Sequence, residues 1–440
     1  MAGRQPVTGR RLVDTREDPS GEQLSPTPER PLSVRLGRAL LIAVLPVLAG
    51  LRAAASEFGG SLLPWRPVMV DLDVYRRAGQ LLLDGGDIYN LPGQLPFLYP
   101  PFAALLAVPL ALLPQTVVEV AWTLAGVLSI LAVLHRFGLK GWVLSVTATA
   151  AVVAAEPVVQ TLAFGQLGIF LVALVILDLA PGPRLLGRRR LLPQGVLTAL
   201  ATAIKLTPGI FLLYLLATRR TRPALVMVVA GSAVTLASAL IAPSPSLTFW
   251  GRLLHGETGL GHSLIYYTNQ SVMADVVRIF GLGGAAAVAG LALSGVVAGL
   301  GVWVAALWDS LGEVRLAVVL CGLAGLLASP VSWVHHFVWV VPLTFCLLED
   351  SVRTPTAEPG AARPVLPLWL RLLGGLLVVW LMVTPLWTLP NGADLELTWT
   401  WQQNLLASTT AILGVALLVA ALFVARRHRR DRQFSRAVTH

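Results

Sequence analysis

Apolar runs long enough to cross a lipid bilayer recur from Leu40 to Val424, and this feature constrains the fold more than any other. Of the 440 residues, 55% are apolar and 13% are charged, whereas roughly 25% of an ordinary soluble domain is charged. The net charge of +10 comes from short basic runs between the apolar segments, a pattern that sets membrane topology. The sequence excludes a soluble enzyme, a secreted disulfide scaffold and a nucleic-acid-binding domain. It predicts an all-α polytopic membrane protein.

The basic runs also predict an orientation. If all of them face the cytoplasm, the apolar segments between them cross the membrane an even number of times. We expect twelve spans with both termini inside, near 37–54, 115–134, 143–155, 165–179, 192–204, 207–218, 224–242, 284–307, 316–328, 331–348, 366–388 and 404–425. A disordered cytoplasmic tail (1–34), a membrane domain (35–425) and a basic cytoplasmic tail (426–440) follow from this division. The run 102–113 is too short to cross and is expected to be a re-entrant or interfacial helix.

This orientation places the unusual polar residues on one side of the membrane. The outer side receives the long loops 56–100, 243–270 and 389–403, the chain breaks at 156–164 and 205–207, and the corner 329–336. An active site facing the periplasm or cell exterior requires such convergence. A transporter would instead need polar residues through the midplane, reachable from both sides.

The first outer loop carries two carboxylates, Asp71 and Asp73, followed by Tyr75 and Arg76. A carboxylate in a partly dry cleft can accept the proton that a sugar hydroxyl loses when it attacks an anomeric carbon. Asp71 is therefore a candidate general base, and the other three are candidate substrate contacts. The alternative is an interfacial helix whose acids pair with neighbouring arginines.

Further along, Tyr99 precedes a Pro-Pro pair and Gln166 lies beside a break in an apolar region. Both are candidate sugar contacts, although Tyr99 would also suit an ordinary membrane-interface aromatic. Lys205 has apolar residues on both sides, and burying it in hydrocarbon would cost on the order of 3 kcal/mol or more. It is a candidate phosphate contact, and the alternatives are snorkelling or pairing with a helix carboxylate.

Two short motifs complete the polar set. Asn269 and Gln270 follow two tyrosines and suit either sugar hydroxyls or a helix cap. His335 and His336 follow Trp333, another candidate substrate contact. Adjacent histidines point about 100° apart on a helix, and ligands at metal spacing are missing nearby, so no metal site is expected. One histidine facing a cavity can hydrogen-bond a phosphate or carry a proton, and the alternative is a pair of interfacial histidines.

Taken in order, these segments resemble the family 87 glycosyltransferases, which are actinobacterial mannosyltransferases and relatives in the C-type membrane glycosyltransferase superfamily. The resemblance covers about residues 37 to 425. It rests on Asp71 to Tyr75, Gly85-Gly86 with Tyr89, Tyr99-Pro100-Pro101-Phe102, Lys205 with Pro208, Asn269-Gln270-Ser271, and Ser329-Pro330-Val331-Ser332-Trp333 with His335-His336.

The resemblance implies transfer of mannose from a polyprenyl-phosphate carrier to a lipid-linked or polysaccharide acceptor of the cell envelope, with inversion of a β-linked donor. It implies that Asp71 is the base, that His335 or His336 contacts the donor phosphate or the reacting sugar, and that Lys205 neutralises that phosphate. The lipid-phosphate sugar is a substrate, and no cofactor or metal is expected. One alternative is the same fold with another donor sugar, such as arabinofuranose. An alternative of another class is a lipid-linked-sugar flippase or permease.

Overall fold

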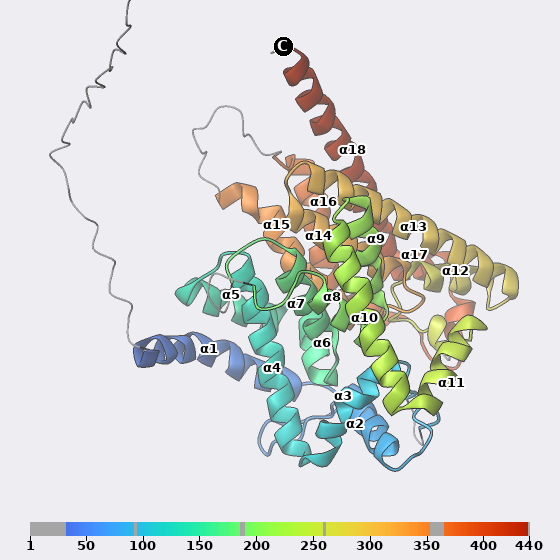
Figure 1. Ribbon diagram of the computed structural model, residues 1–440. Coiled ribbons are helices and arrows are strands. Elements are labelled where there is room, and N and C mark those ends of the chain that lie inside the picture. Colours follow the sequence, from blue (N-terminus) through green and yellow to red (C-terminus); the bar gives the residue numbers. More distant parts are fainter. Residues whose placement is uncertain (1–31, 92–94, 185–189, 258–260, 353–364, 439–440) are drawn as a thin grey trace, which may run out of the picture. The chain divides into compact units, whose positions relative to one another are not determined.

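The computed structural model of the chain describes residues 32–91, 95–184, 190–257, 261–352 and 365–438 (Figure 1). These ranges contain helices and two isolated β-bridges, with no strand among them. The first part comprises α1 (Leu32–Ala54), α2 (Val70–Leu83), α3 (Pro101–Leu112), α4 (Gln115–Arg136), α5 (Gly141–Ala154), α6 (Glu156–Phe164), α7 (Gly168–Leu179), α8 (Val196–Ile204), η1 (Thr207–Gly209), α9 (Ile210–Ala217) and α10 (Thr221–Ile241). The second part comprises α11 (Pro243–Leu254), η2 (Gly261–Leu264), α12 (Val272–Phe280), α13 (Gly284–Ser310), α14 (Val314–Ala328), η3 (Val334–Trp339), α15 (Val340–Val352), α16 (Leu368–Val383), η4 (Pro385–Thr388), η5 (Leu395–Thr398), α17 (Trp401–Ala407) and α18 (Thr409–Val438).

The two predicted tails differ in what the structure describes. Most of the expected N-terminal tail, residues 1–31, lies outside the described residues, and residues 32–34 already belong to α1. At the other end, α18 continues through the basic segment to Val438.

Within the described ranges, five helices are long and apolar enough to cross a membrane by themselves. They span Gly37–Ala54, Gln115–Arg136, Thr221–Ile241, Gly284–Ser310 and Thr409–Phe434. A sixth span arises if α5 and α6 are counted together, although they meet at 77°. Six shorter apolar helices accompany them in the described part of the chain, including α3, α7 and α14. The protein is a multi-pass helical membrane protein, and helix length by itself supports five or six spans rather than the expected twelve.

Several helices end abruptly, and these ends matter for the site. After α8, Lys205 adopts an extended conformation (φ −147°, ψ 132°) before η1 begins. After α14, Ser329 is likewise extended, and the chain returns to helix only at η3. Irregular backbone at membrane depth is tolerated where it is covered by protein or lines a cavity. The breaks therefore indicate a polar site between the helices.

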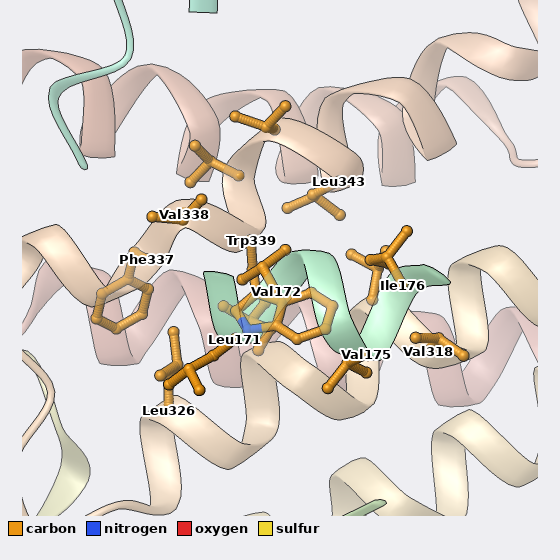
Figure 2. Packing of buried hydrophobic residues seen from close by; sticks show 14 of the residues in the cluster. Leu171, Val172, Val175, Ile176, Val318, Leu326, Phe337, Val338, Trp339 and Leu343 are labelled. Atoms are coloured by element: carbon orange, nitrogen blue, oxygen red, sulfur yellow. The ribbon is translucent and has the colours of Figure 1, made fainter. Parts of the chain in front are cut away.

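The core next to these breaks is packed around Trp339 of η3 (Figure 2). Its ring lies among Leu171 and Val172 of α7 and stacks on Phe211 at 5.8 Å between ring centroids. Gly322 of α14 makes room for it, because a Cβ there would lie 2.4 Å from the indole. The packing holds η3 against α7 and α14, and thereby sets the position of the residues at its start.

A polar cluster ties the other ends of the same helices together. Arg136, at the end of α4, donates hydrogen bonds to the carbonyls of Leu177, Ala180, Gly182 and Pro183. Asp178, near the end of α7, accepts hydrogen bonds from the backbone and side chain of Thr198 and from the Gly195 N–H. These hydrogen bonds cap the start of α8. α7 begins near the helix breaks and ends in this cluster. The Arg136 cluster and the helix breaks therefore lie at opposite ends of α7.

Candidate active site

Asp71 lies in the first turn of α2, where the positive end of the helix dipole favours a carboxylate. The turn between α6 and α7 packs against it. Gly165 adopts a left-handed conformation there (φ 67°), and a Cβ at this position would lie 2.5 Å from the Leu72 Cβ. Only glycine therefore permits this close approach, which brings Gln166 beside Asp71.

The orientation of Gln166 follows from its hydrogen bonds. Its side-chain oxygen accepts from the Tyr75 hydroxyl at 2.6 Å, from the Tyr99 hydroxyl at 3.2 Å and from the Leu167 N–H at 2.9 Å. Three donors on one atom identify it as the oxygen, so the NH2 group is the one that remains for Asp71. Gln166 and Tyr75 are both buried.

The environment of Asp71 suits a proton acceptor. α2 is not among the apolar spanning helices, and Asp71 itself is half-buried. Burial raises the pKa of its carboxyl to about 7, while the Lys205 charge and the hydrogen bond from Gln166 act in the lowering direction. A carboxylate with a pKa near neutrality is better matched to accepting a proton than one with an ordinary pKa near 4.

Lys205 joins this carboxylate to the histidine segment. Its Nζ lies 2.9 Å from Nε2 of His336 and 5.3 Å from the ring centroid of Tyr99. It also interacts electrostatically with Asp71. The structure thus brings the predicted base, lysine and one histidine together from three segments far apart in the sequence.

Two hydrogen-bond donors lie next to the His336 ring, but a neutral ring can accept only one hydrogen bond. The Trp333 backbone N–H points at its Nδ1 at 3.2 Å, and the Lys205 amine lies at its Nε2. A neutral imidazole carries one N–H and one acceptor nitrogen. If Lys205 is charged, one of the two ring nitrogens must therefore carry a hydrogen that points at another donor. An anion with several acceptor oxygens would relieve this conflict.

Two other predicted contacts, Asn269 and Gln270, hydrogen-bond the neighbouring backbone. Asn269 is fully buried and donates to the carbonyls of Leu264 and Pro330, while its side-chain oxygen accepts from the Ser332 N–H. Gln270 is also buried, and its N–H bonds the Ser332 carbonyl. These bonds hold the extended segment before η3. The helix-cap interpretation applies to the neighbouring Ser271, which caps α12.

The contacts of the remaining predicted residues are as follows. Asp73 forms an exposed ion pair with Arg77 at 2.6 Å, as the interfacial-helix alternative expected. Arg76 donates to the Leu110 and Leu113 carbonyls and ties α2 to the end of α3. His335 is buried against Phe164 and His336, with ring centroids 5.0 Å and 4.7 Å away.

Two clefts adjoin at Leu206, the residue after Lys205. The first, of about 310 Å³, is lined by Lys205, His336, Tyr99 and Trp333. Two loops that were predicted to face outward also line it, through residues that include Tyr89, Phe249, Arg252 and Glu257. We call it the outer cleft. The second, of about 480 Å³, runs between α3, α8, α9 and α10 and is lined mainly by apolar side chains. We call it the apolar groove. Both include Pro100 and Leu206, so they adjoin.

The α11 residues of the outer cleft were not among the predicted contacts. Their only sequence signal is a cluster of aromatic and charged residues, Phe249 to Glu257, within an outer loop. An interfacial helix gives the same signal, so the sequence did not distinguish them.

The protein is a multi-pass helical protein in which a carboxylate, a lysine and a histidine meet next to an apolar groove. These features fit an enzyme that acts on phosphate substrates carried by a lipid. The sequence comparisons specify the class. Residues 97–330, about half of the chain, match the model of glycosyltransferase family 87. The chain belongs to this family and is a membrane-bound glycosyltransferase.

Three curated relatives cover between 74% and 92% of the chain. A polyprenol-phosphate-mannose-dependent α-(1-2)-phosphatidylinositol mannoside mannosyltransferase of Mycobacterium tuberculosis is 30% identical over 92% of this chain and 96% of its own length. Its Mycolicibacterium smegmatis counterpart is 32% identical over 84% and 91%. A phosphatidylinositol pentamannoside mannosyltransferase of M. smegmatis is 30% identical over 74% and 79%. No solved structure matches the chain significantly.

Proposed function

We propose that this protein transfers mannose from polyprenyl-phosphate-mannose to a hydroxyl of a mannosylated glycolipid, with inversion at the anomeric carbon. The observation that carries the proposal is the junction of Asp71, Lys205 and His336 at the helix breaks. The relatives, named for this donor and for phosphatidylinositol mannoside acceptors, support the choice of substrates.

In the proposed reaction the acceptor oxygen forms a bond to the anomeric carbon as the bond from that carbon to the phosphate oxygen breaks. Asp71 takes the hydroxyl proton, for which a pKa of about 7 is suited. The bonding electrons leave with the phosphate, which departs as polyprenyl phosphate. One base and one displacement give inversion, so a β-linked donor yields an α-linked product.

Lys205 and His336 are assigned to the leaving phosphate. A phosphate oxygen would accept from both the lysine ammonium and the Nε2–H of His336, while Nδ1 keeps its bond from the Trp333 N–H. This arrangement resolves the donor conflict described above. It also places positive charge and a hydrogen-bond donor where negative charge develops in the transition state.

The apolar groove is assigned to the donor's polyprenyl tail. It adjoins Lys205 through Leu206, and its lining includes Phe102, Leu212 and Met227. A tail in this groove would enter between α3 and α10 from the bilayer and deliver its phosphate to the lysine.

Gln166 and Tyr75 are assigned a positioning role. The Gln166 oxygen is held by three donors, so its amide can keep one orientation toward Asp71. This role replaces direct substrate contact for the two buried side chains. Tyr99 and Trp333, which line the outer cleft, retain the expected substrate contact.

The site is proposed to face the periplasm or cell exterior, and the short apolar helices are proposed to complete the twelve crossings. The basic cluster around Arg136 lies at the opposite end of α7 from Gln166. Positively charged ends normally stay in the cytoplasm. The lipid-phosphate sugar would then be used on the outer leaflet.

The test is transfer by purified protein and its Asp71→Asn variant, with polyprenyl-phosphate-mannose and phosphatidylinositol mannoside acceptors. The variant should lose about 10²- to 10⁴-fold in rate with normal expression and membrane insertion. Asp84→Asn, at the exposed end of the same helix, is the matched control. Full activity of Asp71→Asn would remove Asp71 as the base.

Two further measurements test the alternatives. The mass of the product distinguishes a transferred mannose from an arabinofuranosyl unit. Movement of labelled lipid across the membrane of liposomes without a new glycosidic bond would favour a flippase.

A further inference from the structure

The helix α11 contributes to both clefts with different side chains. Ser246 and Trp250, one turn apart, line the apolar groove, whereas Phe249, Arg252 and Leu253 line the outer cleft. α11 therefore separates the two spaces. A substitution at Trp250 and one at its neighbour Phe249 should disturb different substrates.

The outer cleft contains an aromatic platform next to the reaction centre. Phe249 stacks on Tyr89, with ring centroids 6.0 Å apart and planes 28° apart. The guanidinium of Arg252 lies 5.7 Å from the centroid of the Tyr89 ring. The Tyr89 hydroxyl donates to the Tyr99 carbonyl at 3.1 Å, and Tyr99 in turn lies against Lys205. The platform is thus linked to the residues assigned to the phosphate.

The chemistry of this platform suits a sugar ring. Flat aromatic faces cover the apolar C–H face of a pyranose, and planar guanidinium and carboxylate groups hydrogen-bond its hydroxyls. Arg252 and Glu257 both border the cleft and are exposed, so the cleft is open toward the outside. A glycan that continues beyond the bound ring can leave through this opening. The volume of about 310 Å³ is at the small end of ligand pockets.

We propose that the outer cleft is the acceptor subsite, in which the non-reducing mannosyl end of the glycolipid stacks on Phe249 and Tyr89 and hydrogen-bonds Arg252 and Glu257. This proposal rests on the function proposed above. The donor's tail is assigned to the apolar groove and its phosphate to Lys205 and His336. Of the two clefts, the outer cleft is the one that Lys205 and His336 line, and it is left for the acceptor.

The test compares acceptor and donor kinetics of the full chain in lipid nanodiscs. Acceptor concentration is varied with a phosphatidylinositol mannoside at saturating polyprenyl-phosphate-mannose, and the donor is then varied at saturating acceptor. Phe249→Ala and Arg252→Gln should each lower kcat/KM for the acceptor by about tenfold or more and leave the donor KM within about twofold. Trp250→Ala should show the reverse pattern, with a raised donor KM.

Two further variants guard against a folding artefact. Phe249→Tyr retains the ring and should keep acceptor kcat/KM within about threefold of the wild type. Leu254→Ala, at a side chain that is 86% exposed, should change neither substrate's kinetics.

The proposal is overturned if Phe249→Ala and Arg252→Gln raise the donor KM and spare the acceptor, or if they affect neither substrate. If the wild-type protein itself makes no product from a polyprenyl-phosphate sugar, the proposed function fails first. The two failures are therefore distinguishable.

Discussion

The kcat/KM of transfer should rise about fivefold between pH 6 and pH 7, because Asp71 must be ionised to accept the proton of the attacking hydroxyl. Burial raises the pKa of this carboxyl to about 7, against an ordinary value near 4. With a pKa of about 7, roughly 9% of the enzyme carries the carboxylate at pH 6, roughly 50% at pH 7 and roughly 91% at pH 8. The sign follows from the role: a base gains activity as the pH rises through its pKa.

The assay is initial-rate transfer at subsaturating donor and acceptor, from pH 5.5 to 8.5 at constant ionic strength. Under these conditions the profile reports ionisations of the free enzyme and the free substrates. Preincubation at each pH followed by assay at pH 7.5 separates reversible titration from inactivation. Asp84→Asn should reproduce the wild-type profile, since Asp84 is exposed and its carboxylate accepts its hydrogen bonds from Gln80, one turn earlier on the same helix.

A flat profile between pH 6 and pH 8, or a midpoint near 4, would refute the reasoning. The first result would mean that proton removal by a group of this pKa does not limit the rate. The second would mean that Asp71 is solvated like a surface carboxylate, in conflict with its packing against the α6–α7 turn.

Four further predictions concern neighbouring groups. Gln166→Leu removes a hydrogen bond that lowers the pKa of Asp71, so the midpoint of the pH profile should move to higher pH, and Tyr75→Phe should give a smaller shift in the same direction. Lys205→Met should lower the rate by about 10²- to 10³-fold, as the loss of one stabilising donor does elsewhere, whereas a surface Lys140→Met variant should retain activity. Gly165→Ala should destabilise the protein by about 1–3 kcal/mol in thermal unfolding and reduce transfer, because it combines positive φ with a clash against Leu72; an unchanged melting temperature would contradict this. Treatment with a chelator should leave transfer intact, because the assigned phosphate ligands are Lys205 and His336, and a loss restored by a divalent metal would contradict that assignment.

The sequence by itself determined the class of protein and the main chemical groups. Apolar runs and basic segments are local features whose energetic meaning in a bilayer does not depend on the fold. The same holds for Lys205, because an ionised group in an apolar run is costly enough to require a specific partner wherever it lies. The helices coincide with the predicted segments for this reason, although many are shorter than a crossing requires.

The tertiary structure decided which polar residues meet. Asn269 and Gln270 suit either sugar hydroxyls or a helix cap in sequence, and the structure shows that the Asn269 side chain holds the segment before η3. Gln166 lies beside Asp71 because Gly165 lets two helices approach closely, and no hydropathy pattern encodes that approach. Phe249 lines the outer cleft because it lies on α11, whose side chains line both clefts. The local sequence indicates the free-energy cost of burying a residue, whereas the packing of the helices decides which other residues it contacts.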